Sequence, residues 1–98
     1  MKAIKFAEPW KVDCVDQAMP EPKEGEALIK IHCAAVCGSD IGAFRGTNGL
    51  VSYPRVIGHE LGGEIVSIPS DPAQNPKGLK VGDRVAVDPY IYCGHCYA

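Results

Sequence analysis

The stretch of sequence that decides the fold runs from Glu26 to Val36 and reads EALIKIHCAAV. Apolar or small residues occupy every second position, whereas Lys30 and His32 fall on the alternate positions. A period of two residues is typical of a β-strand with one buried face. The face that we expect to be buried consists of Ala27, Ile29, Ile31, Cys33 and Ala35.

Weaker patterns of the same kind flank this stretch on both sides. Short strands separated by turns rich in the chain's 11 glycines and 8 prolines predict an all-β barrel or sandwich. A helix of one or two turns is predicted only at Ser39–Phe44. Because neither a βαβ pattern nor the motif G-x-G-x-x-G occurs, we expect no dinucleotide-binding fold in this chain. The further predicted strands are Lys2–Phe6, Lys11–Gln17, Glu64–Ile68 and Arg84–Tyr92.

Length and composition predict one soluble domain. A chain of 98 residues, 46% hydrophobic and 22% charged, is ordinary for a globular protein with a single core. The net charge is only −2 and no run of like charges occurs, which argues against binding to nucleic acid or membrane surfaces. No apolar run approaches the about 20 residues of a membrane span, and Lys2, Lys5 and Glu8 interrupt the region where a signal peptide would be apolar. We therefore expect a cytoplasmic protein without nucleic-acid or membrane partners.

Cysteine, histidine and acidic residues gather at three places in the sequence. The five cysteines are an odd number in a chain without an export signal, which favours thiols or metal ligands over disulfides. Two of the places are Cys37-Gly38-Ser39-Asp40 and Gly58-His59-Glu60, and the third is Cys93-Gly94-His95-Cys96. Cys14 and Cys33 belong to none of them, and we expect both to be small buried residues.

Cys37 and His59 offer a thiolate and an imidazole, which are preferred ligands of zinc. The 22 positions between them suit two loops that meet at one rim of a barrel. Glu60 completes the ligand set or lies just outside it, and Asp40 is placed to accept the other N–H of the His59 ring. Taken singly, the alternatives stay open: a cysteine after a strand is most often a small buried residue, and a His-Glu dipeptide is most often solvated.

The order and spacing of these motifs resemble those of the zinc-containing medium-chain alcohol dehydrogenases. The matching segments are Cys37–Asp40, Tyr53–Gly63, Val81–Val85 and Cys93–Cys96, and the resemblance extends over residues 1–98. It implies a mainly β fold, namely a GroES-like, partly open β-barrel with one short helix. It also implies an NAD(P)-binding Rossmann domain that is absent from this chain, so that residues 1–98 are an enzyme fragment that is inactive alone.

The same resemblance implies an oxidoreductase that transfers hydride from a secondary alcohol to NAD or NADP with the help of Zn²⁺. Ser39 and the run Arg84–Pro89 favour the polyol and sugar-acid dehydrogenases of the family, and therefore a small polyol or sugar derivative as substrate. The parent protein is expected to be a homo-oligomer. Two alternatives stay open: a non-catalytic GroES-like module, and a barrel of the zinc-free quinone or enoyl reductase type.

The resemblance also implies a role for each matching side chain. Cys37 and His59 bind the catalytic zinc, and Glu60 binds it in some states and moves away in others. Ser39 passes the alcohol proton towards the cofactor, although a cap at the start of the short helix is an alternative role. The catalytic residues implied in this way are Ser39, Asp40 and Glu60.

Two further motifs depart from the family pattern. Cys93 and Cys96 match only the first two of the four cysteines that hold a structural zinc, so they form an incomplete half-site. Gly42 stands where many members have a histidine that ends the proton relay, so we expect the path from Ser39 to run through water.

Arg45 follows the predicted helix together with Phe44 and Asn48, and this position is a candidate to face the substrate. We hypothesise that the forked donors of Arg45 contact a carboxylate or phosphate of the substrate. The alternative is a solvated surface arginine.

Overall fold

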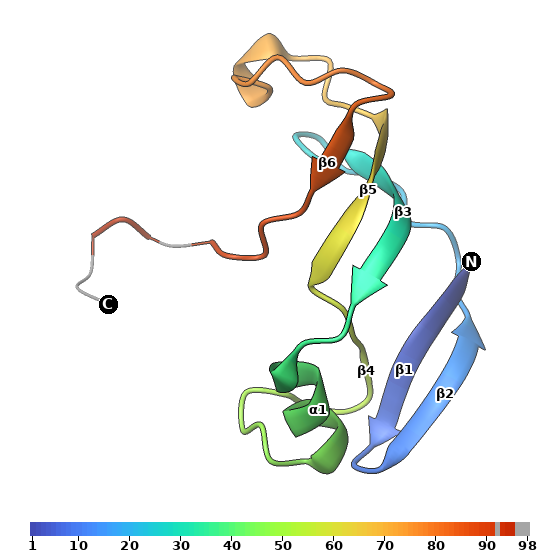
Figure 1. Cartoon of the computed structure of the whole chain (residues 1–98). Helices are drawn as coiled ribbons and strands as arrows, with labels where there is room; N and C mark the ends of the chain where they lie inside the picture. The colour runs from blue at the N-terminus through green and yellow to red at the C-terminus, as the bar shows by residue number, and fades with distance from the viewer. Residues whose placement is uncertain (92, 96–98) are drawn as a thin grey trace.

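The computed structural model describes residues 1–91 and 93–95. Within these residues the chain forms six strands, one α-helix and one turn of 3-10 helix (Figure 1). The mainly β prediction with one short α-helix is therefore confirmed. Neither helix in the described ranges has the length and apolar character that crossing a membrane requires. The elements are β1 (Lys2–Glu8), β2 (Lys11–Asp16), β3 (Leu28–Ala35), α1 (Gly38–Arg45), β4 (Arg55–Val56), β5 (Glu60–Ser67), η1 (Pro72–Gln74) and β6 (Arg84–Ala86).

The strands form two antiparallel sheets of three strands each, in the orders β2-β1-β4 and β3-β5-β6. Figure 1 shows the two sheets side by side, with α1 below the β3-β5-β6 sheet and beside the tip of the β1–β2 hairpin. In the described part of the chain the sheets do not close on each other, which agrees with a partly open barrel.

The predicted strand at Arg84–Tyr92 is too long. The strand β6 ends at Ala86, and one further hydrogen bond runs from the Val87 N–H to the Leu61 carbonyl at 2.9 Å. Pro89 follows and has no N–H to continue the ladder, which explains the early end. Tyr92 lies outside the described residues.

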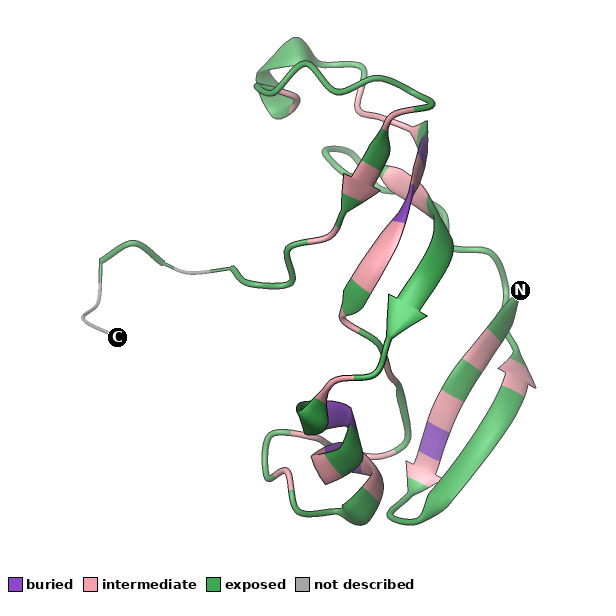
Figure 2. Cartoon of the chain, viewed as in Figure 1, coloured by how far each residue is buried: buried purple, intermediate pink, exposed green. Residues whose placement is uncertain are grey.

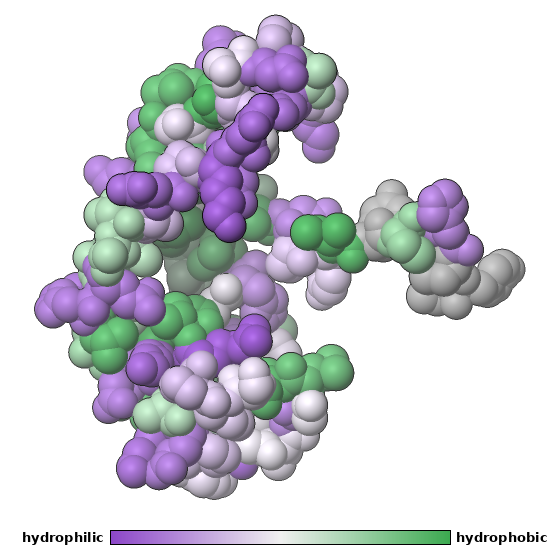
Figure 3. All heavy atoms as spheres, turned by 180° about the vertical axis from the view of Figure 1, so that it is seen from behind, coloured by the Kyte–Doolittle hydropathy of each residue, from purple (hydrophilic) through white to green (hydrophobic). Residues whose placement is uncertain are grey.

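The predicted burial of one face of β3 is wrong. Ile31 is 45% exposed, Cys33 is exposed, and Cys14 on β2 is exposed as well. The buried apolar side chains in the described residues are few, namely Phe6, Ala43 and Ile65 (Figure 2). The alternating pattern of β3 predicts which of its two faces is the more apolar, but no described element covers that face. Accordingly, Figure 3 shows hydrophobic residues reaching the surface on the side opposite to the view of Figure 1.

The register between β3 and β5 brings the two predicted ligand segments together. Ala35 at the end of β3 pairs with Glu60 at the start of β5. Cys37 follows the first of these residues by two positions, and His59 directly precedes the second. An antiparallel pair places the end of one strand beside the start of the other, so both segments lie at the same end of the sheet.

The helix α1 starts directly at this end of the sheet. Its N-cap is Cys37, so the alternative role of Ser39 as the cap is wrong, because Ser39 already lies within the first helical turn. Asp40 in that turn accepts the Cys37 backbone N–H through Oδ2 at 2.9 Å, which satisfies a donor that the helix itself leaves unpaired. The last residue of the helix is Arg45, and the C-cap Gly46 has a φ of 74°, in the left-handed region that favours glycine.

Candidate metal centre

Three side chains that zinc accepts as ligands converge where β3 ends and β5 begins. The Sγ of Cys37, a ring nitrogen of His59 and a carboxylate oxygen of Glu60 lie within 4.8 Å of one another. Cys37 and His59 are partly buried, whereas Glu60 is exposed. Cys37 caps α1, His59 ends the loop before β5 and Glu60 is the first residue of β5. His59 and Glu60 are neighbours in the sequence, whereas the fold brings Cys37 to them from 22 positions away.

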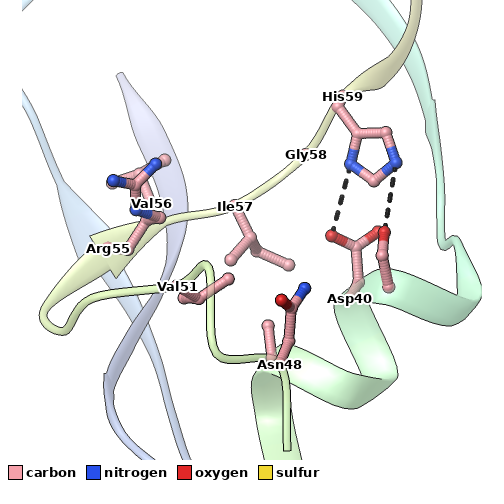
Figure 4. A pocket seen from close by; sticks show the side chains of 10 residues that line it. Asp40, Asn48, Val51, Arg55, Val56, Ile57, Gly58 and His59 are labelled. Carbon is pink, nitrogen blue, oxygen red and sulfur yellow. Dashed lines mark hydrogen bonds and ion pairs between the residues drawn. The ribbon is translucent and has the colours of Figure 1, made fainter. Parts of the chain in front are cut away.

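Both nitrogens of the His59 ring face side chains of α1. Nδ1 lies 3.5 Å from Oδ1 of Asp40, and Nε2 lies 3.4 Å from the hydroxyl of Ser39 (Figure 4). A carboxylate beside Nδ1 favours the tautomer that carries its proton there, which leaves the lone pair on Nε2. The ring is thus oriented with Nε2 available to a hydroxyl or to a metal ion.

Asp40 is the only buried charged residue among those described, with 6% of its surface exposed. Its two oxygens have separate partners, because Oδ2 accepts the N–H of Cys37 while Oδ1 faces His59. A carboxylate is stable in such a buried place only when its hydrogen-bonding capacity is used. One side chain therefore contacts both of the segments that carry the predicted zinc ligands.

The electrostatics of the site favour a thiolate at Cys37. Its pKa is held below the usual range of a cysteine, first by the hydrogen bond from the Ser39 hydroxyl, then by the Ser39 backbone and by His59. Burial and Glu60 act in the opposite direction. The pKa of His59 is raised, first by its hydrogen bond to Cys37, and the charge of Asp40 adds to the rise against the effect of desolvation. The site thus favours the thiolate form of Cys37 and the protonated form of His59 more than water does.

The donor set fits zinc. Sulfur, imidazole nitrogen and carboxylate oxygen are all zinc ligands, and a site with three protein ligands leaves a position open for a substrate or a further ligand. Cys37 and His59 would hold the ion, and exposed Glu60 would complete the set. Among the described residues, this is the single group of three or more such side chains close enough to share an ion.

A pocket of about 220 Å³ opens beside His59, between α1 and the segment 55–59 (Figure 4). Neither Phe44 nor Arg45 lines it, whereas Asn48 does. The Phe44 ring packs instead against Phe6 and Trp10. The residues that line the pocket are Ser39, Asp40, Ala43, Asn48, Val51, Arg55, Val56, Ile57, Gly58 and His59.

Arg55 is a lining residue to which sequence reasoning assigned no role. It stands four positions before His59, but β4 covers only Arg55–Val56 and Gly58 has a φ of 116°, so no alternation along the segment could have marked it. The second predicted metal site gives no comparable geometry: Cys93 is described and exposed, but Cys96 lies outside the described residues.

Comparison with known proteins gives consistent matches. The sequence profile of the alcohol dehydrogenase GroES-like domain matches residues 23–98. An uncharacterized zinc-type alcohol dehydrogenase-like protein of Haemophilus influenzae is 44% identical over 97 residues, which are 99% of this chain and 28% of that protein. L-galactonate-5-dehydrogenase of Escherichia coli is 41% identical over 98 residues, which are 100% of this chain and 28% of that enzyme.

A solved structure shares the fold as well. The alcohol dehydrogenase RspB of Escherichia coli CFT073, determined with the cofactor NADH, is 41% identical and superimposes with a TM-score of 0.78. The match covers 99% of this chain and 27% of that one. The GroES-like fold predicted from the motifs is thus confirmed, and the chain spans little more than a quarter of the length of the relatives that it matches.

Proposed function

Because the chain belongs to the alcohol dehydrogenase GroES-like domain family, we propose that its parent protein is a zinc-dependent, NAD(P)-linked dehydrogenase. Residues 1–98 form the domain that supplies zinc ligands and the first proton acceptor, and a separate Rossmann domain binds the nucleotide. The observation that carries this proposal is the convergence of Cys37, His59 and Glu60 within 4.8 Å.

Zinc at this place supplies a Lewis acid that makes an alcohol easier to deprotonate near neutral pH. The chain's own residues provide the rest of the site. The thiolate of Cys37 and the imidazole of His59 hold the ion, while Asp40 keeps the imidazole oriented through Nδ1 at 3.5 Å. Glu60 is exposed at the start of β5 and can approach or leave the ion without disturbing a packed core.

Ser39 is the residue that we propose moves the proton of the alcohol. Its hydroxyl lies 3.4 Å from Nε2 of His59, the nitrogen that would face the ion. A hydroxyl donates and accepts at once, so Ser39 can take a proton from the substrate while passing its own onward. Gly42, one turn further along α1, offers no side chain to receive that proton, so the onward path runs through water.

The substrate that we propose is a secondary alcohol of the polyol or sugar-derivative class. Support comes from the polar groups of the pocket beside His59, where Asn48 and Arg55 are available to hydroxyl or acidic groups. A relative that is named for L-galactonate, a sugar acid, adds to this support. The NADH of the solved relative favours NAD as the cofactor. A cytoplasmic location and a homo-oligomeric parent stay predictions.

The two rival functions need no metal ligands. A non-catalytic GroES-like module or a zinc-free quinone or enoyl reductase has no use for a thiolate, an imidazole and a carboxylate in one place. The orientation of His59 by the buried Asp40 also disfavours both, because such a contact is typical of a ligating histidine.

Metal analysis of the parent protein separates these functions. We expect that Cys37→Ser lowers the zinc content by one equivalent per chain and abolishes NAD(P)-linked alcohol oxidation. The matched control is Cys33→Ser, which removes an exposed thiol outside the ligand cluster and should leave both quantities unchanged. An unchanged zinc content in Cys37→Ser would contradict the proposal.

A further inference from the structure

A hollow lies between helix α1 and the segment that leads to His59. Helix α1 and the segment 55–59 face each other across the pocket of about 220 Å³, and both contribute residues to its walls (Figure 4). The direct contacts between them are those of His59 with Ser39 and Asp40, and the Tyr53 hydroxyl just before β4 donates to the Ala43 carbonyl of α1. An element that contacts both segments adds to these links.

The strand β1 contacts the segment that leads to His59. The backbones of Lys5 and Phe6 pair with Val56 and Arg55 of β4. The N–H of Ile57, two residues before His59, then donates to the Ile4 carbonyl at 3.3 Å. The chain that approaches His59 is thus hydrogen-bonded to β1 almost up to the ligand.

The same strand contacts α1 through a side chain. The Phe6 ring is 5% exposed, and its centroid lies 5.8 Å from that of Phe44, with an angle of 52° between the ring planes. This distance and angle are typical of a favourable aromatic pair. Trp10 at the hairpin tip adds a second contact. Its backbone N–H donates to the Phe44 carbonyl at 2.7 Å, and its ring packs edge-on against the Phe44 ring with the centroids 5.1 Å apart.

The helix is thus held at one end and presents the site at the other. Phe44 lies in its last turn, whereas Ser39 and Asp40 lie in its first turn and face His59. Cys37 itself follows β3 by two residues, so its backbone is fixed mainly by the β3–β5 pair. The contacts of Phe44, together with the hydrogen bond from the Tyr53 hydroxyl to the Ala43 carbonyl, fix the tilt of α1, which sets how Ser39 and Asp40 meet the imidazole.

We propose that Phe6 is a positioning residue of the metal centre, because its backbone fixes the strand that leads to His59 while its ring fixes the helix that carries Ser39 and Asp40. This inference rests on the metal site proposed above. Loss of the ring contact lets α1 tilt, so that Asp40 and Ser39 no longer orient the imidazole. Metal affinity then falls by more than the general loss of stability explains.

Cobalt binding to the parent protein tests this inference. Co²⁺ bound by a thiolate gives a charge-transfer band in the near ultraviolet, so one titration reports both affinity and ligand geometry. We expect Phe6→Leu to weaken cobalt binding by about tenfold, the lower range seen when residues that support metal ligands are lost, and to shift the band. Phe44→Leu removes the same ring pair from the helix side and should act alike, with the double variant little worse than either single one.

The control is Ile65→Val on β5, a change at a residue that is 1% exposed and lies outside both contacts. It should lower resistance to urea while leaving the affinity and the band unchanged. If Phe6→Leu does not fold, Phe44→Leu provides the comparison. The inference is overturned if the ring variants bind cobalt within twofold of the unsubstituted protein, or if Ile65→Val weakens binding equally. If the unsubstituted protein shows no thiolate band that Cys37→Ser removes, the proposed metal site itself fails.

Discussion

Asp40 and His59 face each other across the gap between α1 and the start of β5, with Oδ1 of the carboxylate 3.5 Å from Nδ1 of the ring. The carboxylate is buried and also accepts the backbone N–H of Cys37 at 2.9 Å. A single side chain therefore couples the orientation of the imidazole to the position of the thiolate.

Asp40→Asn should weaken zinc binding. The amide retains the size of the side chain but loses the charge that favours a proton on Nδ1. Its single oxygen can accept from only one of the two N–H groups that face Asp40, because its NH₂ group can only donate. We expect zinc affinity to fall by about 10- to 100-fold, measured by competition with a chelator. Asp13→Asn on the exposed strand β2 is the matched control. Equal affinities in the two variants would contradict a role of Asp40 at the site.

Cys37 should react with iodoacetamide at lower pH than an ordinary cysteine when zinc is removed. The thiolate is the reactive form, and the pKa of Cys37 is lowered, first by the Ser39 hydroxyl. The pH midpoint of alkylation, followed by peptide mass spectrometry, should lie below the about 8.5 of a free thiol. Ser39→Ala should raise this midpoint, and added zinc should block the reaction. A midpoint that Ser39→Ala leaves in place would exclude the hydroxyl as the cause.

Zinc affinity should fall as the pH falls. The pKa of His59 is raised, first by Cys37, so zinc must displace a proton from the imidazole near neutral pH. Acid protonates the imidazole and the thiolate, and both changes favour the metal-free state. For each ligand that must lose a proton, the affinity should change by about tenfold per pH unit. Titration calorimetry in two buffers of different ionisation enthalpy measures the protons released, and a release of none between pH 6 and 7 would contradict this prediction.

Gly63→Ala should destabilise the fold strongly. A Cβ at this position would lie 2.3 Å from the Lys30 carbonyl oxygen of the neighbouring strand, a backbone atom that cannot move without breaking the β3–β5 pair. We expect a loss of more than about 2 kcal/mol in the free energy of unfolding, measured by urea denaturation. Gly49→Ala is the control, because a Cβ there meets nothing within 4 Å. A similar small change in both variants would show that β3 and β5 are further apart than described.

The sequence alone predicts the elements whose pattern is local. The strands near Lys2, Lys11 and Leu28 and the helix after Cys37 all appear, because alternation, turns and caps act over a few residues. The proximity of Cys37 and His59 was also expected, because the spacing between them suits two loops that meet at one rim of a barrel.

Features that depend on distant partners could not be predicted in this way. The strand β4 has only two residues and is defined by its pairing with β1, which no local pattern reveals. Cys33 is exposed because the layer needed to bury its face is not among the described elements. The contact of Phe6 with Phe44 likewise joins residues far apart in the chain. In the sequence each is an ordinary apolar residue, so no local pattern indicates that they meet.

The most direct test of the central claim is anomalous diffraction at the zinc edge from crystals of the parent protein. The account predicts a peak about 2.3 Å from Sγ of Cys37 and about 2.0 Å from a ring nitrogen of His59, the bond lengths of zinc to sulfur and imidazole. A structure of the zinc-loaded protein with no peak between these two side chains, or with the side chains turned away from each other, would contradict it.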